Sequence, residues 1–84
     1  MNYILDGRYM TSKEEAHRYL AEALGLPAYY GKNLDALSDC LGEMKVGTEI
    51  QLHYAEEMQA ALGTYGERLL RVFQEAENLN FVKK

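Results

Sequence analysis

Two aspartates four residues apart, Asp35 and Asp39, are the side chains of this sequence best placed to do chemistry. The leucines around them, Leu34, Leu37 and Leu41, recur at spacings of three and four and predict the buried stripe of a helix. The two aspartates then share a different stripe, which faces solvent. Like charges four residues apart repel by about 0.2 to 0.5 kcal/mol in an isolated helix. Folding alone therefore gives no reason to pair them, and the pattern favours a partner outside the helix.

A carboxylate pair can serve a hydrolase, or it can accept charge-assisted hydrogen bonds from cationic groups of another protein. A convex helix face provides no obvious cleft in which a substrate could be desolvated, so an enzyme is the weaker interpretation. We expect no metal or cofactor, because His17 and His53 are far apart in sequence and neither has the spacing of a zinc ligand. Cys40 is expected to behave as a small apolar residue.

The helix that carries the aspartates has a clear start and a loop before it. Asn33 is a good N-cap, since its side-chain oxygen can accept from a free backbone N–H of the first turn, and the helix should end near Gly42. Upstream, Gly25 and Pro27 end the preceding helix and force a loop through Tyr29, Tyr30 and Gly31. One of the two tyrosines is expected to fill the core, and Gly31 lets the backbone turn and approach a partner.

The other elements are predicted from periodicity and from their end signals. A strand covers Tyr3 to Leu5 and ends at Asp6-Gly7, and a helix begins at Ser12, which forms a capping box with Glu15. The remaining predictions are a strand with Ile50, Leu52 and Tyr54 on its buried face, a short helix closed by Gly63, a longer helix beginning near Gly66, and a strand stub at Phe81-Val82. This order predicts an α/β domain with a parallel sheet, because parallel neighbours need helical crossovers.

Length and charge restrict the classes of function. Eighty-four residues make a single domain, 1–84. Nine Lys and Arg against thirteen Asp and Glu give a net charge of −4, and the basic residues are scattered, so no direct nucleic-acid binding is expected. Neither a membrane span nor a signal region is recognisable, and the single cysteine fits a reducing compartment. We therefore expect a cytoplasmic protein that does not contact membranes.

One segment carries a family resemblance. The run LPAYYGKNLDALSDCLG, residues 26–42, closely resembles the loop and second helix of the barstar family, intracellular protein inhibitors of an extracellular ribonuclease. Weaker similarity extends to Ile4-Leu5-Asp6-Gly7 and to Val72-Phe73-Gln74-Glu75-Ala76. The resemblance implies three parallel strands packed against about four helices. It also implies a stoichiometric inhibitor that is not an enzyme, whose partner is a small basic secreted ribonuclease and which is a monomer when free.

The resemblance also implies roles for single residues. Asp39 would enter the ribonuclease active site in place of a substrate phosphate, Tyr29 would point outward beside it, and Glu75 would contact a basic residue of the enzyme. The full partner-binding surface is expected to comprise Tyr29, Gly31, Asn33, Asp35, Ser38, Asp39, Gly42 and Glu75. Ser38 departs from the family, which carries a tryptophan at this place. A barstar-like module for another basic protein or toxin domain, without ribonuclease inhibition, is the alternative.

Overall fold

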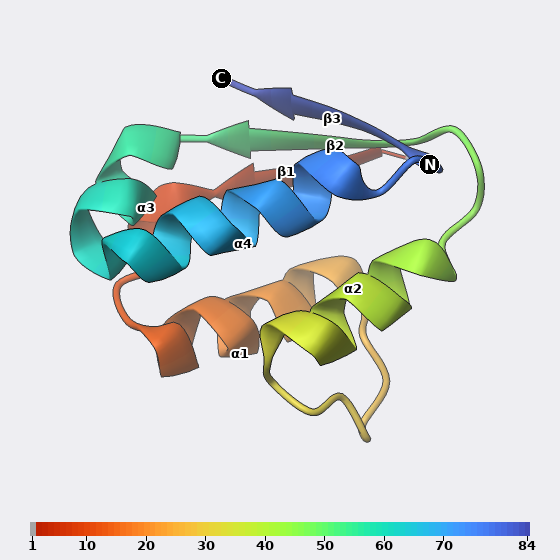
Figure 1. Ribbon diagram of the computed structural model, residues 1–84, viewed down its shortest axis with the longest axis horizontal. Helices are drawn as coiled ribbons and strands as arrows, with labels where there is room; N and C mark the ends of the chain where they lie inside the picture. Colours follow the sequence, from red (N-terminus) through yellow and green to blue (C-terminus); the bar gives the residue numbers. More distant parts are fainter. Residues whose placement is uncertain (1) are drawn as a thin grey trace.

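The computed structural model describes residues 2–84 and shows one parallel sheet lying against a layer of helices (Figure 1). The elements in chain order are β1 (Asn2–Asp6), a short 3-10 turn η1 (Gly7–Tyr9), α1 (Lys13–Leu24), α2 (Leu34–Gly42), β2 (Thr48–His53), α3 (Ala55–Leu62), α4 (Thr64–Glu75) and β3 (Leu79–Lys83). This is the predicted α/β fold, with three parallel strands and four helices.

The strand order β1-β2-β3 explains why the helices share one face of the sheet. Crossovers between parallel strands are nearly always right-handed. Two successive crossovers that step in the same direction must therefore place their helices on the same side. Figure 1 shows α1, α2 and α4 together beneath the sheet, with the loop between α1 and α2 at the edge farthest from the strands.

The core lies between the sheet and the helices. Along β2, Thr48, Ile50 and Leu52 are buried, and the alternate residues are only half-buried. Leu5 of β1 and Phe73 of α4 complete this layer. An alternating strand that buries only one face is unusual for a parallel sheet, whose two faces are commonly both covered. Here the single helix layer accounts for the pattern.

Three of the predicted boundaries are wrong. Tyr54 does not continue β2, because its backbone turns into the left-handed region at φ 59° and starts α3 with the side chain exposed. The longer helix α4 begins at Thr64, before Gly66, because the break lies at Gly63 with φ 59°. Gly66 instead marks a close helix contact, since a Cβ there would lie 3.2 Å from the Cα of Gln59.

The last strand was also underestimated. β3 is five residues long, Leu79–Lys83, and pairs with β2 along its whole length. Its sequence has three apolar residues, Leu79, Phe81 and Val82, and this short run makes the strand pattern weak. The stacked rings of Phe73 and Phe81, with centroids 5.1 Å apart, hold β3 against α4. That contact depends on tertiary structure and left no periodic signal in the sequence.

Candidate partner-binding surface

The start of α2 is built as its sequence predicts. The side-chain oxygen of Asn33 accepts a hydrogen bond from the Ala36 N–H at 2.7 Å, which satisfies one of the free donors of the first turn. Leu37 and Leu41 are fully buried against the core. This cap and this stripe fix the rotation of the helix, so that Asp35 and Asp39 face outward.

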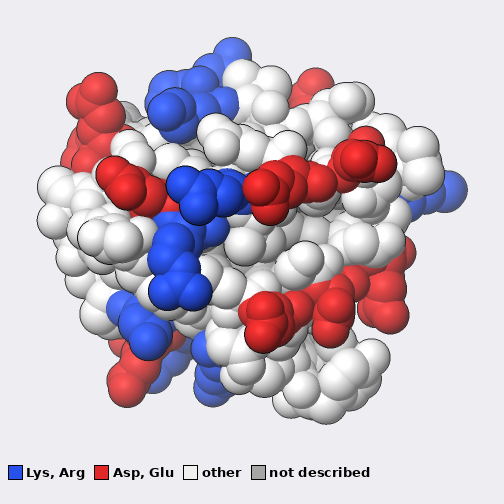
Figure 2. All heavy atoms as spheres, viewed as in Figure 1, with Lys and Arg blue, Asp and Glu red and all other residues white. Residues whose placement is uncertain are grey.

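Both aspartates are exposed and carry no ionic partner. The ion pairs among residues 2–84 are Arg8 with Asp6, and Arg18 with Glu15. Figure 2 shows acidic side chains in a row over α2 and others over the end of α4, with basic side chains over the earlier turns of α4. The carboxylates of α2 are therefore available to a cationic partner. Asp35 also lies in the first turn, where it complements the helix dipole.

The loop before α2 holds its two tyrosines differently. Tyr29 is 84% exposed, whereas Tyr30 is only 7% exposed. The prediction that one tyrosine fills the core and Tyr29 points outward is confirmed. The Tyr30 N–H donates to the Pro27 carbonyl at 3.0 Å, and its hydroxyl lies 2.5 Å from Nδ1 of His17. Burial raises the pKa of the Tyr30 hydroxyl, which stays protonated.

Two hollows lie side by side where α2 meets α4, so the expectation of a cleft-free convex face is wrong. One, of about 280 Å³, is lined by Leu34, Asp35, Ser38, Arg68, Arg71, Val72 and Glu75. The other, of about 340 Å³, is lined by Ser38, Gly42, Val72, Glu75, Ala76, Glu77 and Asn78. Ser38 of α2 lines both hollows, as do Val72 and Glu75 of α4.

The hollows bring together four of the eight predicted residues, Asp35, Ser38, Gly42 and Glu75, from two helices distant in sequence. The other four, Tyr29, Gly31, Asn33 and Asp39, are exposed but line neither hollow. Asn33 acts as a cap and its side-chain amide also donates to the Gly31 carbonyl at 3.3 Å. The candidate surface therefore has two parts, the groove between α2 and α4 and the exposed face formed by the tyrosine loop and Asp39.

Sequence reasoning missed several residues of this surface. Glu43 is exposed and follows Asp39 by four residues, so the spacing alone could have added it to the acidic row. Arg68 and Arg71 line the groove, and nothing in their local sequence indicates that α4 meets α2 there. Asn78 is the least predictable, since it acts over a long sequence separation. Its amide donates to the carbonyls of Leu41 and Met44, each at 2.9 Å, and ties the end of α2 to the turn after α4.

A reactive thiol, a metal site and a membrane-spanning helix are three further features that would bear on the function of the described residues. Cys40 is half-buried beside the core, and burial, followed by the nearby carboxylates of Glu43 and Asp39, raises the pKa of its thiol. Within residues 2–84, no three His, Cys, Asp or Glu side chains are grouped as metal ligands. Over the same residues, no helix combines the length and apolar character that crossing a membrane requires.

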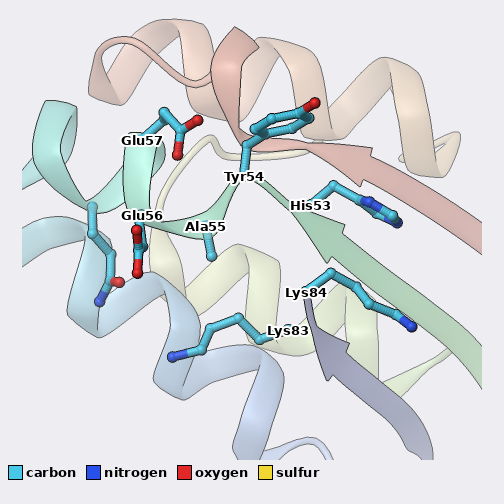
Figure 3. Close-up of a pocket in the computed structure, with 8 residues that line it drawn as sticks. His53, Tyr54, Ala55, Glu56, Glu57, Lys83 and Lys84 are labelled. Carbon is cyan, nitrogen blue, oxygen red and sulfur yellow. The ribbon is translucent and has the colours of Figure 1, made fainter.

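A larger hollow of about 490 Å³ lies at the carboxyl ends of β2 and β3, the place where α/β proteins commonly bind ligands. Figure 3 shows that its charged side chains do not converge. Glu56 and Glu57 point in different directions, and Lys83 and Lys84 also diverge. The lining mixes both signs of charge over exposed side chains. We therefore place the candidate site at the groove between α2 and α4 and at the tyrosine loop.

Two comparisons with known proteins bear on this surface. The profile of a protein family described as barstar (barnase inhibitor) matches residues 1–81. A protein of Bacillus subtilis (strain 168) named "Putative ribonuclease inhibitor YrdF" is 41% identical over 75 residues, which cover 88% of this chain and 82% of that protein. The residues matched by the family profile include α2, the tyrosine loop and α4.

Proposed function

The chain belongs to the barstar family, and from this premise we propose that it is a stoichiometric protein inhibitor of a small basic secreted ribonuclease. One observation carries the proposal: the exposed carboxylates of Asp35 and Asp39 lie on a capped helix and have no ionic partner among the described residues, and the loop that leads into this helix exposes Tyr29. In the free protein the dipole of α2 accounts for Asp35 but not for Asp39. A cationic pocket in another protein would gain hydrogen bonds and charge pairing from both carboxylates.

Asp39 is the residue that blocks the active site of the ribonuclease. A site that binds RNA phosphates presents converging Arg, Lys and His donors, and a carboxylate can accept several charge-assisted hydrogen bonds from them. Because α2 is capped and its leucines are buried, the Asp39 carboxylate is held in place before binding, which lowers the entropic cost of association. The carboxylate thereby occupies the position of a substrate phosphate and excludes RNA.

The neighbouring residues extend the contact. Tyr29 supplies rigid, largely exposed aromatic area, the kind of side chain enriched at interface hot spots. Asp35 and Glu75, on opposite sides of the groove, meet further basic groups of the enzyme. The inhibitor performs no catalysis and acts in the cytoplasm, where it protects the producing cell from its own ribonuclease.

The first prediction concerns Asp39. Replacing Asp39 by Ala leaves cationic groups of the enzyme buried without a partner, so binding should weaken by at least about 2 kcal/mol, or roughly thirtyfold. Losses of this size are typical of buried charge pairs at protein interfaces, and the complex of barstar with its ribonuclease is a known example. Most of the loss should be a faster dissociation rate, measured by surface plasmon resonance against small basic ribonucleases.

Glu57→Ala provides the matched control, since it removes one exposed carboxylate from α3 with the same change in net charge. It should leave the dissociation rate unchanged. If the complexes of Asp39→Ala and Glu57→Ala with the ribonuclease dissociate equally fast, Asp39 does not block the active site.

Ser38 motivates a second candidate function, a barstar-like module that binds another basic protein or toxin domain without blocking a ribonuclease. The groove around Ser38 would accept a protruding side chain that a tryptophan there would exclude. Titration of the purified chain into small basic ribonucleases, with RNA cleavage as readout, separates the two. An inhibitor stops turnover near one-to-one stoichiometry, whereas the second candidate leaves RNA cleavage unaffected.

A further inference from the structure

His17 is a buried titratable residue that the proposed binding surface does not use directly. It lies on α1, is 1% exposed, and bridges two tyrosines from different elements. Its Nδ1 lies 2.5 Å from the Tyr30 hydroxyl, and its Nε2 lies 2.5 Å from the Tyr65 hydroxyl of α4. The imidazole thus connects the tyrosine loop, α1 and α4.

The unequal burial of Tyr30 and Tyr65 selects one proton arrangement. Tyr30 is buried, so its hydroxyl proton needs an acceptor within the protein, and Nδ1 of His17 is the partner it has. Nε2 then carries the ring proton and donates to Tyr65, whose half-buried hydroxyl can turn its own proton toward water. A neutral His17 in this tautomer satisfies both tyrosines.

This bridge anchors the loop that carries Tyr29. Between Gly25, which ends α1 in the left-handed conformation, and Asn33, which begins α2, Tyr30 is the one residue of the loop that is fully buried. Its neighbours Tyr29 and Gly31 are exposed. The position of Tyr29 therefore depends on how firmly the adjacent Tyr30 is held.

We propose that His17 and Tyr65 are positioning residues for the partner-binding loop, and that the loop opens more readily when His17 gains a proton. A proton on Nδ1 removes the acceptor of the Tyr30 hydroxyl and adds a charge inside the protein. The role in binding rests on the proposed function, whereas the control of loop opening is a property of the free protein.

The surroundings of His17 disfavour that charge. The groups around it are Tyr30 of the loop, Tyr65 of α4 with Arg68 nearby, and Lys13, Glu14, Arg18 and Lys32, which line an adjacent hollow of about 320 Å³. Three of the four charged groups lining the hollow are cations. Burial, followed by the charge of Lys13, lowers the pKa of His17 below its ordinary value of about 6.5.

The sign of the pH effect follows. When the loop opens, His17 meets water and recovers its ordinary pKa, so the open state binds more protons than the closed state below about pH 6.5. Opening is therefore favoured as the pH falls from about 6.5 toward the lowered pKa of the closed state. Above about pH 6.5, protonation of His17 no longer favours the open loop.

The experiment measures amide hydrogen exchange in the free protein by NMR. The Tyr30 amide, hydrogen-bonded to Pro27, reports on the loop, and the Ile50 amide in β2 reports on the core. Tyr65→Phe should lower the protection factor of Tyr30 about fivefold relative to Ile50, the effect of one hydrogen bond. Tyr19→Phe is the matched control, because it removes a hydroxyl that accepts from the Asp6 N–H at 2.8 Å, away from the loop. Equal protection of Tyr30 in these two variants would overturn the proposal.

The pH profile separates positioning from a general structural role. As the pH falls from 7 to 5, the protection of Tyr30 should fall relative to that of Ile50 in the natural chain. In His17→Gln, whose amide can donate and accept but cannot titrate, this dependence should disappear. A dependence that persists in His17→Gln contradicts the proposal. If His17→Gln fails to fold, the hydrogen exchange of Tyr65→Phe and the pH profile of the natural chain still test the proposal.

Partner binding supplies the last readout. Tyr65→Phe should speed dissociation from an inhibited ribonuclease, with Tyr19→Phe unchanged. If no ribonuclease is inhibited by the natural chain, the proposed function fails and the exchange data still test the anchor. If inhibition holds and Tyr65→Phe changes neither exchange nor dissociation, the anchor alone is refuted.

Discussion

Asp39 lies in the middle of α2, where aspartate has poor helix propensity, and four residues from another unpaired carboxylate. Both effects destabilise the free protein, by about 0.7 kcal/mol for propensity and about 0.2 to 0.5 kcal/mol for repulsion. A residue that serves partner binding can destabilise the free protein to this extent, because its favourable contacts form only in the complex.

We therefore predict that Asp39→Ala stabilises the free protein while it weakens binding. The free energy of unfolding, measured by urea denaturation, should rise by about 0.5 to 1 kcal/mol. Asp35→Ala is the matched control, since Asp35 lies in the first turn and its charge complements the helix dipole, so its removal should stabilise less. A clear loss of stability in Asp39→Ala would show that the carboxylate already has a structural role.

At the scale of elements, the turn after β1 fits against the junction between β2 and α3. A Cβ at Gly7 would lie 2.3 Å from the backbone oxygen of Tyr54, closer than side-chain atoms can approach. On the outer side, the Arg8 guanidinium lies 3.9 Å over the Tyr54 ring and also pairs with Asp6, whose pKa it lowers. Only glycine at position 7 allows these two backbones to meet.

Gly7→Ala should therefore lower the free energy of unfolding by about 2 kcal/mol, because the backbone of Tyr54 must move. Thermal or urea denaturation measures the loss. Gly42→Ala is the control: it lies in α2 with no atom within 4 Å of a new Cβ, so helix propensity should leave it unchanged or up to about 1 kcal/mol more stable. Similar losses in both variants would refute the role of the close contact.

The packing of α2 on α4 is the other relation between elements that matters for function. Asn78 holds the end of α2 through two carbonyls, and Val72 lines the groove beside Ser38. The groove is lined from both helices, by Ser38 of α2 and by Val72 and Glu75 of α4. Its shape is therefore a property of two elements together and of neither alone.

For the whole molecule, net charge and its distribution govern the encounter with a partner. The chain carries a net charge of −4, and acidic side chains line α2 on the face seen in Figure 2. A basic ribonuclease would be steered toward this face by electrostatic attraction, which salt screens over a Debye length of roughly 10 Å at 0.1 M.

The association rate should consequently fall by about tenfold or more between low salt and about 0.5 M salt, with a much smaller change in the dissociation rate. Stopped-flow mixing with the inhibited ribonuclease measures both. Glu57→Ala should lower the association rate slightly at low salt through net charge alone. An association rate independent of salt would argue against electrostatic steering.

Local rules accounted for much of the architecture. Several predicted features are present in the structure, and each depends on a few neighbouring residues. They are the helix caps at Ser12 and Asn33, the end of α1 at Gly25 before Pro27, and the alternation of buried Ile50 and Leu52 with half-buried neighbours. The boundaries at Tyr54 and Gly66 were wrong because the backbone changes direction at Tyr54 and at Gly63, both with φ 59°. β3 was underestimated because its stability comes from pairing with β2 and stacking on Phe73.

The sequence by itself determined that an acidic, capped helix follows a tyrosine loop in a small α/β domain, since propensity, capping and periodicity act over one or two turns. Only the tertiary structure decided that α4 lies beside α2 across a groove at Ser38, and that His17 joins Tyr30 to Tyr65. These contacts connect residues far apart in the chain. Their energies depend on packing and burial, which no local pattern records.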